Sequence, residues 1–320
     1  MTRRSPRIVG VVLVVGLATG VGLRQFARAR TVQLFGRLVA RVDTPDSVVA
    51  LTFDDGPVPA LTDSLVAVLR ARGVRATFFV TGRELAAAPA AGRALVSAGH
   101  ELGNHTYSHR RMVLASPATV RREVERTDAL IRAAGARGPI YVRPPYGAKL
   151  VALPFYLWRT GRTTLMWDVE PDSYPEVAAS PERIVAHVLA RVRPGSVVLL
   201  HPWYRARATS RAAVPLLIDS LRARGYQVTT VGGLLARSAS RRRPPNVAGS
   251  GRNRPARLGR SGSARPGSPP NVGVRRQHAP CACPALLPIG ATSAPRLLVG
   301  APPRTPSRPL APPRAPEARE

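Results

Sequence analysis

The sequence has few cysteines, few aromatic residues and a single lysine, and these shortages exclude several kinds of protein. Cys281 and Cys283 are the two cysteines among 320 residues, so the rest of the chain can hold neither an internal disulfide nor a thiolate metal site. Cys-Ala-Cys without further ligands is a poor zinc signature. Aromatic residues make up 5% of the chain, and they do not alternate with basic residues as they do on surfaces that stack nucleic-acid bases.

Positive charge is abundant and comes almost entirely from arginine. The formal net charge is +30, and Lys149 is the one lysine, a usage that indicates a GC-rich coding sequence. Residues 238–320 hold 15 arginines against Glu317 and Glu320. Such charge can attract nucleic acid or anionic membranes. Because no nucleic-acid-binding motif accompanies it, we expect no specific nucleic-acid partner.

The N-terminal 30 residues have the pattern of a membrane signal. Arginines precede an apolar run over residues 8–23, and no clear cleavage site follows it. The run is about 16 residues, which is short for a membrane span, and four glycines weaken it further. We predict an uncleaved signal-anchor or transmembrane segment over residues 1–30, with the catalytic domain outside the cytoplasm. A cleaved signal peptide and a secreted protein are the alternative.

The C-terminal residues 238–320 show no hydrophobic periodicity. They contain about half of the 33 prolines, together with serine, glycine and arginine. A segment of this composition cannot bury enough apolar surface to offset the entropy lost on ordering. We predict a disordered Arg/Pro-rich tail, and a frameshift or an overlong reading frame is another possible origin for it.

Residues 47–235 alternate regularly between strand and helix patterns. Strands are expected over residues 48–53, 76–80, 101–104, 140–143, 163–167, 197–201 and 226–229. Helices are expected over residues 61–72, 84–98, 117–134, 181–193 and 209–224. This alternation predicts a parallel α/β fold, and about seven βα units in so short a domain favour a distorted, incomplete (β/α)7 barrel over an open sheet. We expect this domain to be monomeric.

Two groups of polar residues follow predicted strands and have the composition of a metal site. Asp54 and Asp55 end the first strand, where adjacent carboxylates must point in different directions, so one could bind a cation while the other accepts a proton. His105 and His109 lie four positions apart and would share one face of a helical turn. One Asp and two His make an open catalytic metal set. The alternatives are an ordinary Asp-Gly turn and two unrelated loop histidines.

Two further groups follow later strands. Arg143 begins Arg-Pro-Pro-Tyr-Gly, which includes Tyr146, and an arginine at a strand end can clamp a carboxylate. His201 ends a buried strand and is a candidate general acid, because imidazole titrates near neutral pH. A plain Pro-Gly loop and a core histidine are the simpler interpretations of these two groups.

Together these groups resemble the motifs of the polysaccharide deacetylase family, also called the NodB-homology or carbohydrate esterase family 4. The order Thr-Phe-Asp-Asp-Gly, His-x-x-x-His, Arg-Pro-Pro-Tyr-Gly, Trp-Asp-Val-Glu-Pro-Asp and Leu-Leu-His covers about residues 47–235. The resemblance implies the distorted barrel of that family. It also implies hydrolysis of N-acetyl groups on an N-acetylglucosamine-containing polysaccharide such as peptidoglycan, a chitin-like oligomer or an exopolysaccharide.

The resemblance also implies a role for each motif residue. Asp54 would be the general base, held by Arg143, and His201 the acid that protonates the leaving amine. The backbone N–H of Tyr146 would bind the oxyanion. The divalent cation, Zn²⁺ or a similar ion such as Co²⁺, would be held by Asp55, His105 and His109.

The sequence departs from the family pattern in two places. Glu170 stands where the family has Asp, and Pro202 stands where the family often has Asp. The carboxylate that supports Arg143 or His201 is therefore either Glu170 or Asp172. Two other functions stay open from the sequence: an O-acetyl esterase acting on a glycan such as xylan, and a membrane-anchored glycan-binding protein with an idle site.

Overall fold

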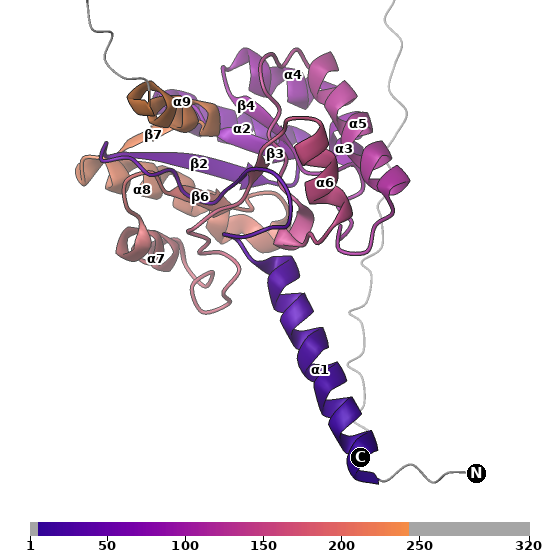
Figure 1. Ribbon diagram of the computed structural model, residues 1–320. Helices are drawn as coiled ribbons and strands as arrows, with labels where there is room; N and C mark the ends of the chain where they lie inside the picture. The colour runs from indigo at the N-terminus through magenta and orange to yellow at the C-terminus, as the bar shows by residue number, and fades with distance from the viewer. Residues whose placement is uncertain (1–5, 243–320) are drawn as a thin grey trace, which may run out of the picture. The chain divides into compact units, whose positions relative to one another are not determined.

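The structure is a computed structural model that describes residues 6–242. Most of the predicted tail over residues 238–320 lies outside the described residues, and so do both cysteines. Within the described residues, the strands and helices form an α/β arrangement with parallel pairing throughout the ladders (Figure 1).

The central strand is β2 (Val48–Asp54), every residue of which is buried. It pairs with β3 (Thr77–Val80) on one side and β6 (Val197–Leu200) on the other, and β4 (Glu101–Asn104) follows β3. The short β7 (Gln227–Thr229) pairs with the first half of β2. Because these strands are parallel and in register, their carboxyl ends meet at one edge, and the residues that follow each strand are brought together there.

The remaining strands do not complete a regular barrel. β1 (Leu38–Val39) pairs with β5 (Thr164–Leu165) as a separate two-stranded unit. Single-residue bridges connect it to the larger sheet: Asn104 to Val142, Val142 to Thr164, and Arg41 to Ser196. The predicted seven-unit barrel is therefore not confirmed. The strand predicted over residues 140–143 is reduced to one bridging residue, Val142, because prolines on both sides of it cannot donate to a ladder.

The two faces of β2 belong to different parts of the core. Successive side chains of a strand point to opposite faces. Val49, Leu51 and Phe53 pack in one apolar cluster, which includes residues of α2 and α8. Val48 and Ala50 pack in another, with residues of β5 and β6. Burial on both sides explains why the strand is continuously apolar rather than alternating.

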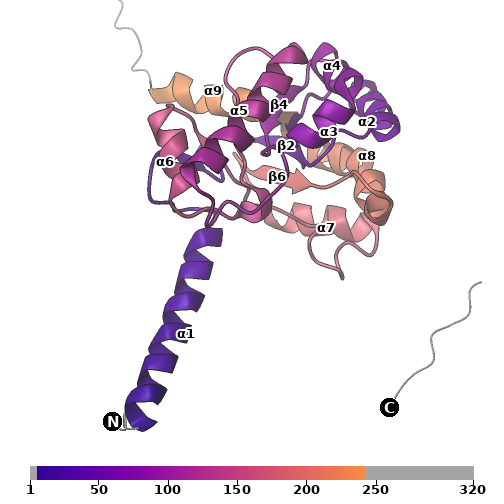
Figure 2. The ribbon, with the colours of Figure 1, turned by 90° about the vertical axis from the view of Figure 1, so that its right-hand side faces the viewer.

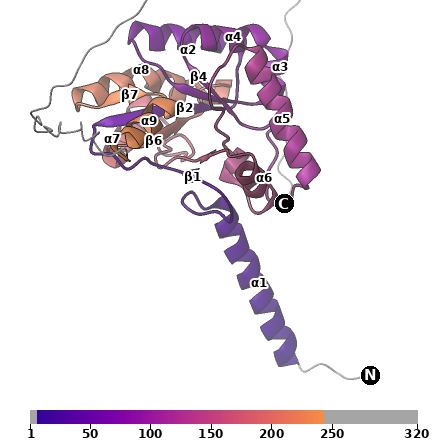
Figure 3. The same ribbon diagram turned by 45° about the horizontal axis from the view of Figure 1, so that its top comes forward.

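Helices surround the sheet on several sides. They are α2 (Pro59–Ala71), α3 (Gly82–Ala87), α4 (Pro89–Ser97), α5 (Pro117–Ala133), α6 (Ala152–Arg159), α7 (Pro181–Arg191), α8 (Ala208–Ala223) and α9 (Val231–Arg242). Short 3₁₀ turns occupy η1 (Pro145–Gly147) and η2 (Arg205–Arg207). From α6 the neighbouring helices follow one another as α5, α3, α4, α2, α8 and α7 (Figures 2 and 3).

The helix predicted over residues 84–98 is in fact two helices. Pro89 has no backbone N–H to donate and disfavours helix at the preceding residue, so α3 ends at Ala87 and Pro89 begins α4. Proline likewise occupies the first turn of α2, α5 and α7, where no intrahelical donor is lost.

The N-terminal segment differs from its prediction. Residues Pro6–Arg28 form α1, but no helix in the described part of the chain is long and apolar enough to cross a membrane. The predicted transmembrane segment is therefore not supported, in keeping with an apolar run shorter than the ~20 residues that a span needs. The end of this segment contacts the α/β unit instead: Ala27 is buried, and its carbonyl accepts a hydrogen bond of 2.9 Å from Lys149 N.

Candidate active site

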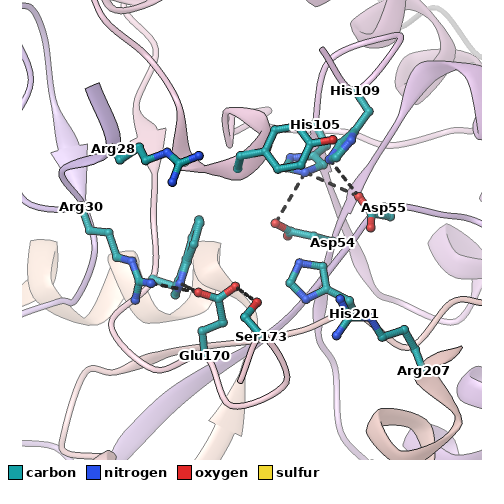
Figure 4. A pocket seen from close by; sticks show the side chains of 13 residues that line it. Arg28, Arg30, Asp54, Asp55, His105, His109, Glu170, Ser173, His201 and Arg207 are labelled. Atoms are coloured by element: carbon teal, nitrogen blue, oxygen red, sulfur yellow. Dashed lines mark hydrogen bonds and ion pairs between the residues drawn. The ribbon is translucent and has the colours of Figure 1, made fainter. Parts of the chain in front are cut away.

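Most of the polar residues predicted from the sequence line one pocket at the carboxyl edge of the sheet (Figure 4), and the other two, Arg143 and Asp172, are buried behind it. The pocket has a volume of about 400 Å³. Its lining residues are Arg28, Arg30, Asp54, Asp55, His105, His109, Tyr146, Gly147, Trp167, Glu170, Ser173, His201 and Arg207. The loops after β2, β4 and β6 therefore contribute to one site, although more than 140 residues of chain separate the first of them from the last.

Asp55, His105 and His109 form a set that fits a metal ion. Each offers one ligand atom, and these atoms lie within 4.8 Å of one another. Asp55 Oδ1 is 3.7 Å from His105 Nε2 and 3.2 Å from His109 Nε2. This oxygen is buried and has no hydrogen-bond partner. A buried carboxylate oxygen that faces two imidazole nitrogens and lacks a donor of its own fits a bound cation, because buried polar atoms are otherwise satisfied.

A hydrogen bond at Nδ1 fixes the tautomer of His105 and leaves Nε2 unprotonated. Its Nδ1 lies 2.8 Å from the Arg143 carbonyl, which can only accept, so Nδ1 carries the proton. Nε2 is then left with a lone pair on the side of Asp55, where a cation could bind to both, as in most histidine metal ligands. Burial lowers the pKa of His105 to about 3 even though nearby Asp55 acts in the opposite direction. The ring is therefore neutral at ordinary pH, which is the form that binds a metal.

The loop between the two histidines is fixed by a carboxylate that the sequence analysis did not identify. Glu123 of α5 is buried, and its Oε2 accepts hydrogen bonds from Tyr107 N at 3.0 Å and Ser108 N at 2.8 Å. Its Oε1 accepts a third from Ser108 Oγ at 2.8 Å. The signal in the sequence was an acid among the buried positions of a helix, where a carboxylate is rarely found unless it is paired.

Backbone strain is concentrated in the loops of this site. His105 and His109 do not share a helical turn, as the sequence analysis assumed, but lie in an irregular loop. Among the described residues, the non-glycine residues with positive φ are Asp55, Thr106, His109, Tyr146 and Tyr204. Three of them line the pocket. Such conformations cost of order 1–3 kcal/mol each and persist where the surrounding structure holds them, commonly at functional sites.

Asp54 is held by a buried arginine. Arg143 Nη1 donates to Asp54 Oδ1 at 2.5 Å and to Thr52 Oγ1 at 3.0 Å. Its other nitrogens donate to the carbonyls of Leu165 and Met166. Burial raises the pKa of Asp54, and the charge of Arg143 offsets part of the rise. A carboxylate with a raised pKa and one oxygen free of Arg143 is suited to accept a proton.

His201 is paired with Asp172. Asp172 Oδ1 is 3.0 Å from His201 Nδ1, and Oδ2 accepts from His201 N at 2.7 Å. Ser210 Oγ donates to the same Oδ2 at 2.8 Å. Burial by itself lowers the pKa of His201, but the hydrogen bond and charge of Asp172 outweigh it and raise the pKa to about 9. The imidazole is therefore protonated at neutral pH and carries a proton on Nε2.

These contacts show that the carboxylate beside His201 is Asp172 and not Glu170. Among the residues that the structure describes, Glu170 hydrogen-bonds neither Arg143 nor His201. It accepts from Trp167 Nε1 at 2.7 Å, from Arg30 Nη2 at 2.9 Å and from Ser173 Oγ at 2.6 Å. Glu170 thus belongs to the wall of the pocket, where it fixes an arginine from the N-terminal segment.

Tyr146 lies at the mouth of the site. Its φ is 59°, its ring centroid is 4.7 Å from that of His109, and Arg111 stacks on its ring at 4.6 Å. Five further residues line the pocket without having been predicted from the sequence to do so: Arg28, Arg30, Trp167, Ser173 and Arg207. Arg28 and Arg30 were assigned to a membrane segment, and no local pattern indicates that this segment reaches the pocket.

Comparison with known proteins agrees with these motifs. The profile of the polysaccharide deacetylase family matches residues 41–163. A chitooligosaccharide deacetylase of Bradyrhizobium sp. (strain ANU 289) is 37% identical over 192 residues, which are 56% of this chain and 87% of the relative. The peptidoglycan-N-acetylmuramic acid deacetylase PdaC of Bacillus subtilis is 33% identical, over 60% of this chain but only 40% of its own length.

A solved structure is also similar. The family 4 carbohydrate esterase from Streptomyces lividans, determined with acetate, aligns with a TM-score of 0.52 and 37% identity. The alignment covers 57% of this chain and 91% of that one. The shared motifs, the extent of the identity and the shared fold lead to one conclusion: this chain is a hydrolase of the polysaccharide deacetylase family.

Proposed function

We propose that the protein hydrolyses N-acetyl groups of a polysaccharide that contains N-acetylglucosamine, releasing acetate and leaving a free amine. The observation that carries the proposal is the convergence of three units on one pocket: a carboxylate held by an arginine, an Asp-His-His set and a protonated histidine. Relatives named as chitooligosaccharide and peptidoglycan deacetylases support it. Since peptidoglycan and most such polymers lie outside the cytoplasm, we propose that the reaction takes place there.

We further propose that Asp55, His105 and His109 hold a divalent cation, Zn²⁺ or a similar ion such as Co²⁺. Carboxylate and neutral imidazole ligands suit these ions. A bound divalent cation supplies Lewis acidity, which lowers the pKa of water toward ~7 and polarises a carbonyl. The remaining groups of the pocket supply the proton transfers and the positioning.

Asp54 is assigned as the general base. Arg143 holds Oδ1, so the carboxylate cannot rotate to bring both oxygens toward the histidines. Oδ2 stays on the pocket side, 3.7 Å from His105 Nε2. From there it can take the proton of a water that attacks the acetamide carbon, and the backbone N–H of Tyr146 can stabilise the resulting oxyanion. One donor of this kind is worth roughly 3 kcal/mol.

His201 is assigned as the general acid. Asp172 accepts from its Nδ1 side, which leaves the Nε2 proton for the departing nitrogen. An amine is a poor leaving group unless it is protonated, whereas an alcohol leaving an ester depends less on an acid. The protonated state that Asp172 confers on His201 therefore favours amide over ester hydrolysis, and an O-acetyl esterase is the alternative to be tested beside it.

The first prediction concerns metal content. Purified full-length protein should bind one Zn²⁺ or Co²⁺, and His105→Ala or Asp55→Asn should abolish stoichiometric binding, because each removes one of three ligands. His187→Ala is the matched control, since that histidine contacts Tyr174 away from the pocket and should keep full occupancy. Elemental analysis of the variants after dialysis gives the answer. Full occupancy in His105→Ala would mean that the ion is held elsewhere.

The second prediction concerns the reaction. Metal-loaded protein should release acetate from N-acetylated oligosaccharides and not from O-acetylated xylan, because protonation by His201 is needed most by an amine. Chelation should stop the reaction, and added zinc or cobalt should restore it. Enzymatic measurement of acetate on both substrates decides between the two activities. Release from xylan alone would support the esterase, and release from neither by metal-loaded protein would contradict the proposed activity and favour the idle binding protein.

The third prediction concerns pH. Activity requires Asp54 ionised and His201 protonated. The value of kcat/KM should therefore rise through the pKa of Asp54 and fall as pH passes the pKa of His201, which is raised to about 9. Asp172→Asn removes the charge that raises the pKa of His201. It should therefore move the alkaline limb to lower pH.

The control for the pH experiment is Glu182→Gln, an exposed acid on α7. It should leave both limbs where they are. An Asp172→Asn enzyme whose alkaline limb coincides with that of the parent would remove the His201–Asp172 pair from the mechanism.

A further inference from the structure

Three arginines from outside the family motifs line the pocket (Figure 4). Arg28 ends α1, Arg30 follows it, and Arg207 ends η2. In the close-up view, Arg28 and Arg30 lie across the pocket from the Asp and His side chains. The wall that faces the reacting groups therefore carries two arginines of the N-terminal segment, whereas Arg207 lies on the side of His201.

Two of these arginines have partners within the protein. Arg30 Nη2 is 2.9 Å from Glu170 Oε2, and its guanidinium lies 4.8 Å from the centre of the Trp167 ring. Arg207 donates to the backbone carbonyl of Asp172. Both contacts build the wall of the pocket, and they leave these two guanidinium groups partly occupied.

Arg28 is different. Among the described residues its side chain makes no hydrogen bond, ion pair or ring contact, yet it lines the pocket. The backbone on both sides of it is fixed. The carbonyl of Ala27 accepts from Lys149 N at 2.9 Å, and the carbonyl of Ala29 accepts from Lys149 Nζ at 2.5 Å. The two hydrogen bonds from Lys149 therefore fix the backbone at Arg28, whose side chain has no partner of its own among the described residues.

The hydrogen bond from Lys149 Nζ requires a charged ammonium group to be buried. Lys149 is the one lysine of the chain and is 2% exposed. Burial lowers its pKa to about 8, which reflects the loss of hydration of its ammonium group. A buried ammonium that donates to a carbonyl of residues 27–30 stabilises that segment at the pocket. The backbone of this segment is thus fixed by the fold, while the side chain of Arg28 is exposed and lines the pocket.

The carboxylates that line the pocket are all directed to other groups. Asp54 is paired with Arg143, Glu170 with Arg30, and Asp55 faces the two histidines. Arg28 therefore offers its guanidinium donors to whatever enters. A guanidinium binds a carboxylate in a bidentate, planar geometry, and the charge assistance makes such contacts about twice as strong as neutral hydrogen bonds. A neutral glycan offers only hydroxyl and amide groups and has no charge for this group to pair with.

We propose that Arg28 is a specificity-determining residue that binds a carboxylate carried by the glycan close to the acetylated sugar. The substrate is then an acidic polysaccharide, and neutral chitin-type oligomers are weaker substrates. The carboxylate can come from a lactyl ether on the sugar or from a uronic acid. This inference rests on the proposed deacetylase function and adds the charge of the substrate to it.

The test uses full-length protein and matched substrate pairs. Each pair consists of an acetylated oligosaccharide with its carboxylate and the same oligosaccharide with that group reduced to a primary alcohol. One pair carries the lactyl ether and the other a uronic acid. The wild type should have the higher kcat/KM on the acidic member, and Arg28→Gln should lower the ratio of the two values about tenfold, or ~1.4 kcal/mol.

Two further variants make the result specific. Arg28→Lys keeps the charge without the planar fork and should retain part of the preference. Arg24→Gln removes an exposed arginine of the same helix that does not line the pocket, so it should leave the ratio unchanged. The pair whose ratio depends on Arg28 identifies the source of the carboxylate.

Binding of the same substrate pairs to metal-loaded protein is also measured by calorimetry, which tests the role of Arg28 without requiring turnover. Tighter binding of the acidic member that Arg28→Gln abolishes would support it even if no acetate were released, a result that contradicts the proposed function alone. Equal binding of both members by the wild type would overturn it. So would a loss in Arg28→Gln that is the same for the acidic and the reduced member, since that is the signature of a structural role.

Discussion

The buried ion pair between Arg143 and Asp54 is the contact on which the rest of the site depends. Arg143 reaches the end of β2 from the segment after Val142 and is fixed there by Thr52 and by two backbone carbonyls. The pair makes neighbouring carboxylates unequal. Arg143 holds one oxygen of Asp54, whereas Asp55, with a φ of 71°, presents Oδ1 to both histidines. One dipeptide can therefore provide both a base and a ligand.

The same pair also links the two strand systems. Arg143 follows Val142, which bridges Asn104 on one side and Thr164 on the other. Its side chain hydrogen-bonds Asp54 at the end of β2 and the carbonyl of Leu165 at the end of β5, so it ties the smaller strand pair to β2. A buried guanidinium without its carboxylate would be strongly destabilising. The irregular part of the fold and the catalytic edge are thus stabilised by one interaction, which couples the integrity of the site to the packing of the sheet.

The sequence was sufficient to predict what depends on local pattern. The run over residues 48–53 predicted a buried strand, and the motif residues predicted the family. What it could not predict depends on contacts between distant segments. Pro89 divides a helix whose periodicity looks continuous. Asp172 and Glu170 are distinguished only by their partners, His201 for the first and Trp167 for the second. Glu123 accepts hydrogen bonds from a loop 15 residues earlier in the chain. The docking of residues 27–30 through Lys149 has no signal in either segment alone.

The central claim is that Arg143 reserves Asp54 for proton transfer and leaves metal binding to Asp55 and the histidines. The most direct measurement is the zinc content of purified Asp54→Asn protein, determined on the same preparation as its acetate release. The account predicts one zinc per chain, as in the parent, with turnover lost. Loss of the zinc in this variant would contradict it, because Asp54 would then be a ligand and the division of roles between the two aspartates would be wrong.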